Sequence, residues 1–309
     1  MRIGKCMQKT FLLLSAHSRH LVVSSLTVTL MGLAMGRAAV THDFSGGSGT
    51  SDSTQFVGTA GNGWTNAFTA STENASVSNS IISTSPMIAG GGDYLQRTVT
   101  GGASAGNRRS VLYRTYGSSG DLDTTQAHTI SFLWRADSVG SGFNSTADYF
   151  MLFGNSGAPN LDSSANTSWL IRYQGASQGG AGDIVGGKFA VYDGTRTGGT
   201  MLDATLFADT GMAVSVGTVY QFTIQTDPVT ANWSVNIQEV GGSNSYQSST
   251  LGWRNAANNT STTIGWGAKP SATDEAFTFS LDNISVVPEP GTAILGAFGA
   301  LLLIRRKRD

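Results

Sequence analysis

The amino-acid sequence predicts an all-β protein, a two-sheet antiparallel β-sandwich. Glycine and small polar residues dominate the middle of the chain, where lysine and glutamate, the usual surface residues of helices, are nearly absent. Short runs of alternating apolar and polar residues lie between the glycines, and this period of two is typical of half-buried strands. Turn sequences follow these runs at intervals of roughly 8 to 12 residues, which favours a sandwich over a parallel α/β fold.

Residues 1–38 predict a secretory signal peptide with a signal helix. Scattered cations precede an apolar run at 21–35 and small residues follow it, so we expect signal peptidase of the general secretion machinery to cut near position 38. A retained membrane anchor is the alternative, although about 15 apolar residues are few for a membrane span. The only cysteine, Cys6, lies in this segment, so the mature protein is expected to contain no disulfide bond.

Residues 40–286 predict the sandwich itself. Residues 40–110 are expected to supply the first strands, and turns are expected at Asp193-Gly194 and at 227–232. The clearest later strands are predicted at 128–134, 149–153, 169–173, 188–192, 219–224, 233–237 and 276–286. The last of these ends just before the C-terminal tail, so we expect the tail to leave from an edge of the sandwich.

The C-terminal tail, residues 287–309, has three parts. Its first part is Pro288-Glu289-Pro290, and because proline lacks a backbone N–H we expect no helix or central strand to run through it, which leaves it extended and accessible. The apolar run at 291–304 follows. As a transmembrane helix it would span about 21 Å, less than the roughly 30 Å hydrocarbon core of a bilayer. The final part is a basic cluster that predicts a stop to translocation, Arg305, Arg306, Lys307 and Arg308.

This tail resembles the PEP-CTERM sorting signal of Gram-negative bacteria. The resemblance covers about the last 23 residues and depends on the Pro288-Glu289-Pro290 motif, the short apolar segment and the basic end, in that order. It implies that an exosortase-type transpeptidase recognises the motif while the protein is held at the inner membrane. It further implies that the body is then released or attached at the cell surface or in the extracellular matrix, in bacteria that make exopolysaccharide or biofilm.

The body also resembles a known architecture. From about residue 110 to 286 the order of the expected strands is similar to that of laminin-G-like and concanavalin-A-like jelly rolls. The segments that carry this resemblance are 129–136, 189–194, 220–224 and 281–286. The resemblance implies a jelly-roll sandwich of two antiparallel sheets.

The net charge of −1 for the whole chain hides an acidic body. Of the 19 cations and 20 acids, nine cations and one acid lie in 1–38 and 291–309, which leaves 10 cations and 19 acids and a net charge of −9 for the rest. Such a surface repels phosphate backbones, so no nucleic-acid partner is expected. Polyanionic glycans are disfavoured for the same reason, unless a local basic patch or a divalent cation intervenes.

No catalytic residue is predicted. A glycosidase needs two carboxylates across the scissile bond, and the adjacent Asp274 and Glu275 would point to opposite faces of a strand. The sequence Gln126-Ala127-His128 resembles the Gln-x-His element of jelly-roll polysaccharide lyases, whose other catalytic residues are tyrosine and arginine. A groove in which His128 meets such side chains would favour a lyase, and a buried His128 would count against it.

Two further sets of residues are candidates for binding. Asp121 and Asp123 are candidate calcium ligands, but two carboxylates fall short of the six to eight oxygens that calcium takes, and a simple turn also explains them. No other cofactor is expected. Trp64, Trp253 and Trp266 lie among glycine and asparagine residues and are candidates for stacking on sugar rings, with burial in the core as the alternative.

We therefore expect a non-enzymatic, exported protein of the cell surface or matrix that is sorted by its tail and binds carbohydrate. The first alternative is a secreted polysaccharide lyase or hydrolase on the same jelly roll, with His128 as a lyase residue. The second is a matrix protein without a ligand, which would show no exposed tryptophans on a common face.

Overall fold

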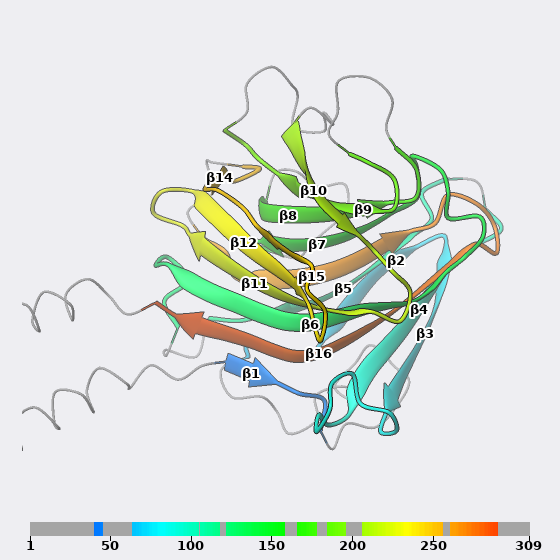
Figure 1. Ribbon diagram of the computed structural model, residues 1–309, viewed down its shortest axis with the longest axis horizontal. Coiled ribbons are helices and arrows are strands. Elements are labelled where there is room, and N and C mark those ends of the chain that lie inside the picture. The colour runs from blue at the N-terminus through cyan, green and yellow to red at the C-terminus, as the bar shows by residue number, and fades with distance from the viewer. Residues whose placement is uncertain are drawn as a thin grey trace, which may run out of the picture. The chain divides into compact units, whose positions relative to one another are not determined.

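The computed structural model describes residues 40–45, 64–104, 106–117, 122–157, 166–177, 184–195, 206–255 and 260–289. Residues Ala39–Glu289 form one compact unit, which Figure 1 shows as two layers of β-strands. The predicted signal helix and the predicted membrane helix at 291–304 lie outside the described residues. Within the described part of the chain, no helix is long and apolar enough to cross a membrane.

One layer is a nine-stranded antiparallel sheet. Its main path has the order β13-β12-β11-β6-β16-β4-β3, with β1 paired to β16 and β14 paired to β12. The strands are β1 (Val40–His42), β3 (Ala75–Ile82), β4 (Tyr94–Gly101), β6 (His128–Val139), β11 (Val219–Asp227), β12 (Asn232–Glu239), β13 (Ser245–Gln247), β14 (Leu251–Gly252) and β16 (Ala276–Pro288). Strand β16 lies between β6 and β4 inside the sheet, but among the described residues its last two, 287 and 288, pair with β6 only.

The other layer is a seven-stranded antiparallel sheet with the order β10-β9-β8-β7-β15-β5-β2. Its strands are β2 (Thr69–Glu73), β5 (Arg109–Thr115), β7 (Tyr149–Asn155), β8 (Thr167–Gln174), β9 (Lys188–Tyr192), β10 (Phe207–Ala213) and β15 (Thr263–Lys269). The prediction of a two-sheet antiparallel sandwich is therefore confirmed.

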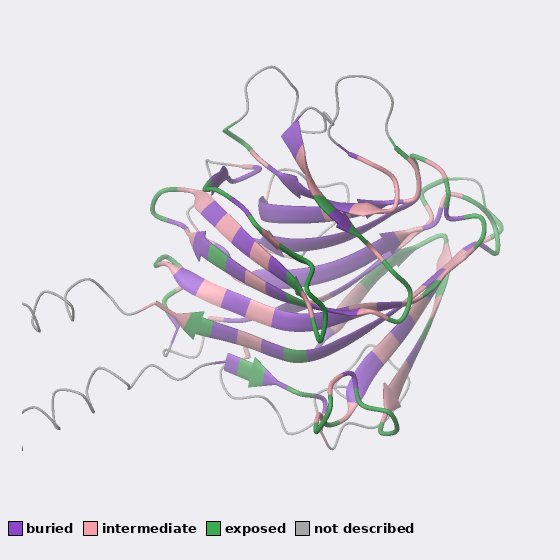
Figure 2. Ribbon diagram, viewed as in Figure 1, coloured by how far each residue is buried: buried purple, intermediate pink, exposed green. Residues whose placement is uncertain are grey.

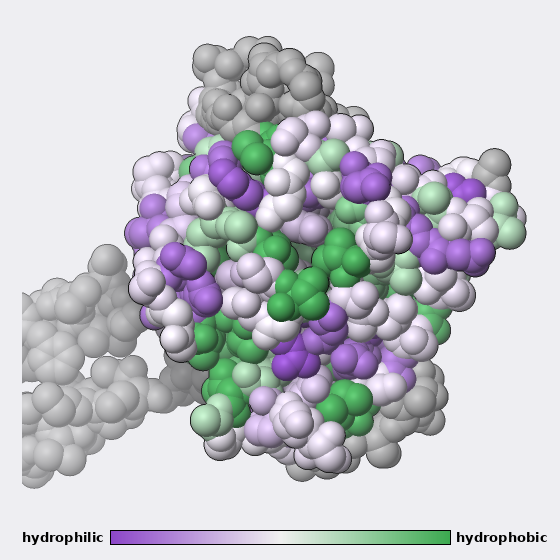
Figure 3. Space-filling view, turned by 45° about the vertical axis from the view of Figure 1, so that its right-hand side comes forward, coloured by the Kyte–Doolittle hydropathy of each residue, from purple (hydrophilic) through white to green (hydrophobic). Residues whose placement is uncertain are grey.

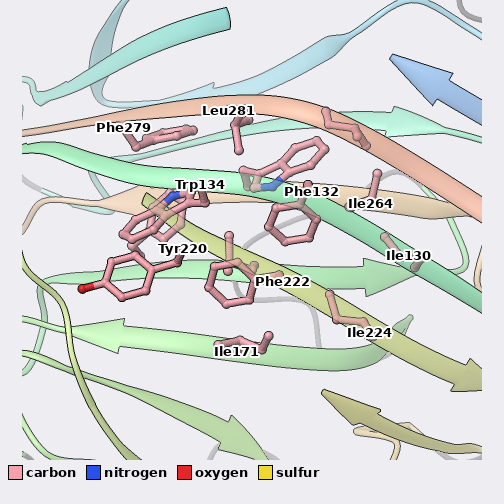
Figure 4. Packing of buried hydrophobic residues seen from close by; sticks show 14 of the residues in the cluster. Ile130, Phe132, Trp134, Ile171, Tyr220, Phe222, Ile224, Ile264, Phe279 and Leu281 are labelled. Atoms are coloured by element: carbon pink, nitrogen blue, oxygen red, sulfur yellow. The ribbon is translucent and has the colours of Figure 1, made fainter. Parts of the chain in front are cut away.

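An aromatic core fills the space between the sheets. Trp134 of β6 is 0 % exposed, and its ring lies 5.2 Å from that of Phe150 and 5.5 Å from that of Phe189, which belong to the opposite sheet. Figure 4 shows Trp134 beside Tyr220 and Phe222 of the neighbouring strand β11. The alternating side chains of each strand place the apolar residues on this inner face, which explains the period of two in the sequence.

The seven-stranded sheet also carries apolar residues on its outer face. Tyr149, Met151 and Phe153 of β7 point outward, and all seven residues of β7 are buried. Ile184 and Leu206, from segments that connect the strands, belong to the same apolar cluster. Most of this face is therefore covered, and the rings of Tyr149 and Phe153 are not available for stacking on a sugar, whereas Tyr113 of β5 is partly exposed.

Candidate functional site

The two ends of the sandwich leave it at the same place, which we call the tail junction. It consists of Val40 at the start of β1, residues 286–289 at the end of β16 and residues 127–129 at the start of β6. Val40 pairs with Val286, and Pro288 pairs with His128. The predicted signal-peptide cleavage near position 38 and the Pro-Glu-Pro motif therefore lie within a few residues of one cross-strand pair.

The first two residues of the Pro-Glu-Pro motif belong to this junction. Pro288 is the last residue of β16, and both Pro288 and Glu289 are half-buried. The Glu289 N–H donates to the Ala127 carbonyl at 3.0 Å, and Thr129 Oγ1 donates to Glu289 Oε1 at 3.1 Å. The motif therefore starts in an extended conformation, as expected, but the expectations that no central strand includes it and that it is accessible are wrong for Pro288, which ends β16 and is half-buried, and Glu289 is half-buried as well. Pro290 lies outside the described residues.

The position of Pro288 in a strand has a simple physical reason. Successive backbone N–H groups of a strand point to opposite sides, and since Glu289 donates to β6, the nitrogen of Pro288 faces away from β6. The pairing of β1 has already ended there, at the pair Val40 and Val286. The missing N–H of proline therefore faces the side on which no described residue pairs with Pro288, and a sheet tolerates proline there.

Strand β1 is only three residues long, but aromatic contacts hold it in place. Phe44, two residues after the end of β1, is 0 % exposed and stacks on Phe68 with the ring centroids 5.6 Å apart. Trp64 Nε1 donates to the Thr41 carbonyl at 3.0 Å. The Arg114 guanidinium lies over the Trp64 ring at 4.5 Å, and burial lowers the pKa of Arg114 to about 10. One face of Trp64 is thus occupied by Arg114, although the residue remains partly exposed.

His128 forms a polar cluster with tyrosine beneath the tail junction. Its Nδ1 lies 2.9 Å from the Gln126 carbonyl, which can only accept, so Nδ1 carries the proton and Nε2 accepts from Tyr116 Oη at 3.2 Å. Tyr116 Oη also contacts Ser261 Oγ at 3.2 Å. His128 is 0 % and Tyr116 is 1 % exposed, so the cluster is sealed inside the sandwich.

The surroundings of the cluster do not suit acid–base chemistry. Burial lowers the pKa of His128 and raises the pKa of Tyr116, so both groups are held neutral. A lyase base must reach a proton on its substrate. His128 does meet a tyrosine, as the lyase alternative requires, but it does so in the core and not in a groove, which counts against that alternative.

Two of the three tryptophans proposed for sugar stacking are core residues. Trp266 of β15 is 0 % exposed and packs edge-on against Phe132, and Trp253 is 2 % exposed with Nε1 donating to the Asn232 carbonyl at 3.0 Å. The expectation that they stack on sugars is therefore wrong, because neither ring reaches the surface. Trp64 alone of the three is partly exposed.

A pair of carboxyl groups, which the sequence did not indicate, joins two loops. Asp148 Oδ1 and Glu275 Oε2 both accept from the Ser271 N–H, at 2.7 and 2.8 Å. Burial, followed by the neighbouring charge of Asp148 and a hydrogen bond to it, raises the pKa of Glu275. The two groups touch and are 0 % and 6 % exposed, so no glycosidic bond fits between them as in a glycosidase.

Of the two candidate calcium ligands, the structure describes Asp123, which lies in a turn. Asp123 Oδ1 accepts from the Thr125 N–H at 3.0 Å and from its hydroxyl at 2.6 Å, which is an Asx turn, while Asp121 lies outside the described residues. No group of three or more His, Cys, Asp or Glu side chains within the described ranges is arranged to hold a metal ion.

Asp282 is a buried acid that the sequence also did not indicate. It lies at an irregularity of β16, and its Oδ1 accepts from the Asn283 N–H at 2.8 Å. Its Oδ2 accepts no hydrogen bond within the described part of the chain. Burial, with the nearby charges of Asp43 and Asp93, raises the pKa of Asp282 to about 7. The group is therefore partly protonated near neutral pH.

No protein-family model matches this chain, and no curated protein sequence matches it. Among solved structures, the catalytic domain of the glycoside hydrolase family 131 protein from Coprinopsis cinerea is 7 % identical, with 69 % of this chain and 78 % of that chain covered and a TM-score of 0.45. The family 131 β-glucanase catalytic domain from Podospora anserina is 10 % identical, with 70 % and 84 % covered and a TM-score of 0.45. Lectin I from Ulex europaeus, in complex with the methyl glycoside of α-L-fucose, is 10 % identical, with 80 % and 97 % covered and a TM-score of 0.43. At these scores the similarity decides nothing about function.

Proposed function

We propose that this chain is an exported, non-enzymatic protein of the bacterial cell surface or extracellular matrix. Its concanavalin-A-like body binds carbohydrate, and a PEP-CTERM-type tail sorts it through an exosortase-type transpeptidase. The single observation that supports the proposal is the tail junction, where Val40 pairs with Val286, so that both predicted processing sites lie within a few residues of one strand pair. A body built in this way can be held at the same membrane by its signal peptide, its tail or both.

The composition of the body supports an extracellular role in carbohydrate binding. Only 13 % of the residues of the chain are charged, and the acidic body repels polyanions. In the face shown in Figure 3, most visible residues are pale, of intermediate hydropathy, and the hydrophobic and hydrophilic ones form separate small groups. Serine, threonine and tyrosine have intermediate hydropathy, and their hydroxyl groups can form hydrogen bonds with sugars.

The sorting part is tested by fractionation in the native host. We expect the wild-type body at the cell surface or in the medium, and Glu289→Ala/Pro290→Ala in the inner membrane with its tail intact. Pro86→Ala changes an exposed proline away from the tail and serves as the matched control, which should behave like the wild type. An identical distribution of the wild type and the Glu289→Ala/Pro290→Ala variant would refute sorting by the motif.

A further inference from the structure

A continuous row of uncharged hydrogen-bonding side chains crosses the outer face of the nine-stranded sheet. The strand register places one such residue from each of six neighbouring strands in line. We call this set the polar row: Gln247 of β13, Asn236 of β12, Thr223 of β11, Ser131 of β6, Ser285 of β16 and Thr41 of β1. All six are half-buried or exposed.

The positions beside the polar row are also free of charge along β11 and β12. Gln221, Gln225 and Gln238 are exposed and point to the same face, because they are two residues from Thr223 or Asn236 along their strands. Figure 2 shows the resulting alternation of buried and more exposed residues along β11, β12 and β6. Solvent-facing sheets usually carry lysine and glutamate, so a row of this length without either is unusual.

Hydrogen bonds within the row hold its side chains in place. Ser131 Oγ and Ser285 Oγ are 2.8 Å apart, and Asn236 Nδ2 donates to Gln247 Oε1 at 3.1 Å. Each of these hydroxyl and amide groups keeps further donor or acceptor capacity toward the solvent side. Neighbouring strands are about 4.8 Å apart, so the row extends for about 24 Å. The distance between successive side chains of the row is comparable to the length of one hexose unit in an extended polysaccharide.

We propose that the polar row binds an uncharged polysaccharide chain that lies across the strands, from β13 toward the tail junction. This inference rests on the proposed carbohydrate-binding function and identifies its site and the class of glycan. The row contains no cation that could pair with an acidic sugar, and the body carries a net charge of −9 over residues 39–290. It also lacks the aromatic, methionine and arginine side chains that are enriched at protein interfaces, so a protein partner fits it poorly.

The test is affinity electrophoresis of the protein purified from its host in native gels. The gels contain hydroxyethyl cellulose, laminarin, galactomannan or dextran as neutral polysaccharides, and alginate as the anionic one. The variant Thr223→Lys/Asn236→Lys places two bulky cations in the middle of the row. The matched control, Ala103→Lys/Ser104→Lys, makes the same charge change at two exposed residues in the β4–β5 connection. Thermal unfolding of each variant verifies that it is folded.

We expect at least one neutral polysaccharide to retard the wild type and the control, and the row variant to bind it at least tenfold more weakly. The isosteric variant Thr223→Val, which removes one hydroxyl without adding charge, should also bind more weakly. If the row variant and the wild type bind the neutral polysaccharide equally, the polar row is not the site, although carbohydrate binding stands. If alginate alone retards the wild type, the class of glycan is wrong. If no polysaccharide does so, carbohydrate binding itself fails.

Discussion

Replacement of Asp282 by asparagine should stabilise the protein in a pH-dependent way. Burial and the charges of Asp43 and Asp93 raise the pKa of Asp282 from 3.8 to about 7, so the folded state binds more protons than the unfolded state between these values. Stability contributed by this group is therefore present at low pH and is lost as the pH rises toward 7. Asparagine keeps the shape and an acceptor for the Asn283 N–H, but it never ionises.

The magnitude follows from the size of the shift. A rise of about three pKa units corresponds to about 4 kcal/mol at 1.36 kcal/mol per unit. Burial is the largest cause of the rise, so solvent screening of the exposed Asp43 removes only a small part of this free energy. In urea unfolding followed by tryptophan fluorescence, Asp282→Asn should match the wild type at pH 4 and exceed it by most of that free energy at pH 8. Asp274→Asn, at an exposed acid in the loop before β16, is the control and should show no such trend. A variant that is less stable than the wild type at pH 8 would refute the reasoning.

Three further substitutions test the packing. Phe44→Ala removes a fully buried ring after β1 and should cost about 3–5 kcal/mol in urea unfolding, with faster amide exchange in β1; an effect below about 1 kcal/mol would show that β1 is not fastened there. Asp148→Ala leaves the N–H groups of Ser145 and Ser271 without this acceptor and should cost about 3 kcal/mol. Asp274→Ala removes an exposed acid with a φ of 59° and should cost only about 1 kcal/mol, from backbone strain. His128→Ala should destabilise the protein by about 1–3 kcal/mol. The wild type should release no unsaturated uronates from acidic polysaccharides. If the wild type releases them and a folded His128→Ala variant does not, the lyase alternative is restored.

The strands could be predicted where apolar residues alternate with polar ones. The segments predicted at 128–134, 149–153, 169–173 and 219–224 all lie in strands of the structure. Strand β15 was missed because its glycines resemble a loop sequence. Its Gly265 faces outward, where an added Cβ would lie 2.6 Å from the Phe153 ring, so glycine is required there by packing between strands. For the same reason the sequence left open whether Trp266, which lies between two glycines, is exposed or buried, and the structure buries it.

The polar features depend on contacts between residues that are distant in sequence. Asp148 and Glu275 meet because two loops share the Ser271 N–H, and no spacing in the sequence indicates this. The two acids whose charges raise the pKa of Asp282 are Asp43, just after β1, and Asp93, just before β4. Both are far from Asp282 in the sequence. The Pro-Glu-Pro motif, by contrast, can be read directly from the sequence, but the pairing of Pro288 with β6 depends on the register of the sheet.

The most direct test of the proposed function is the intact mass of the protein isolated from its native host. We predict a mass that corresponds to a chain starting near residue 39 and lacking the apolar run and basic end after the Pro-Glu-Pro motif, with or without an attached group. A mass that includes residues 291–309, found on protein in the inner membrane, would contradict sorting at the tail junction.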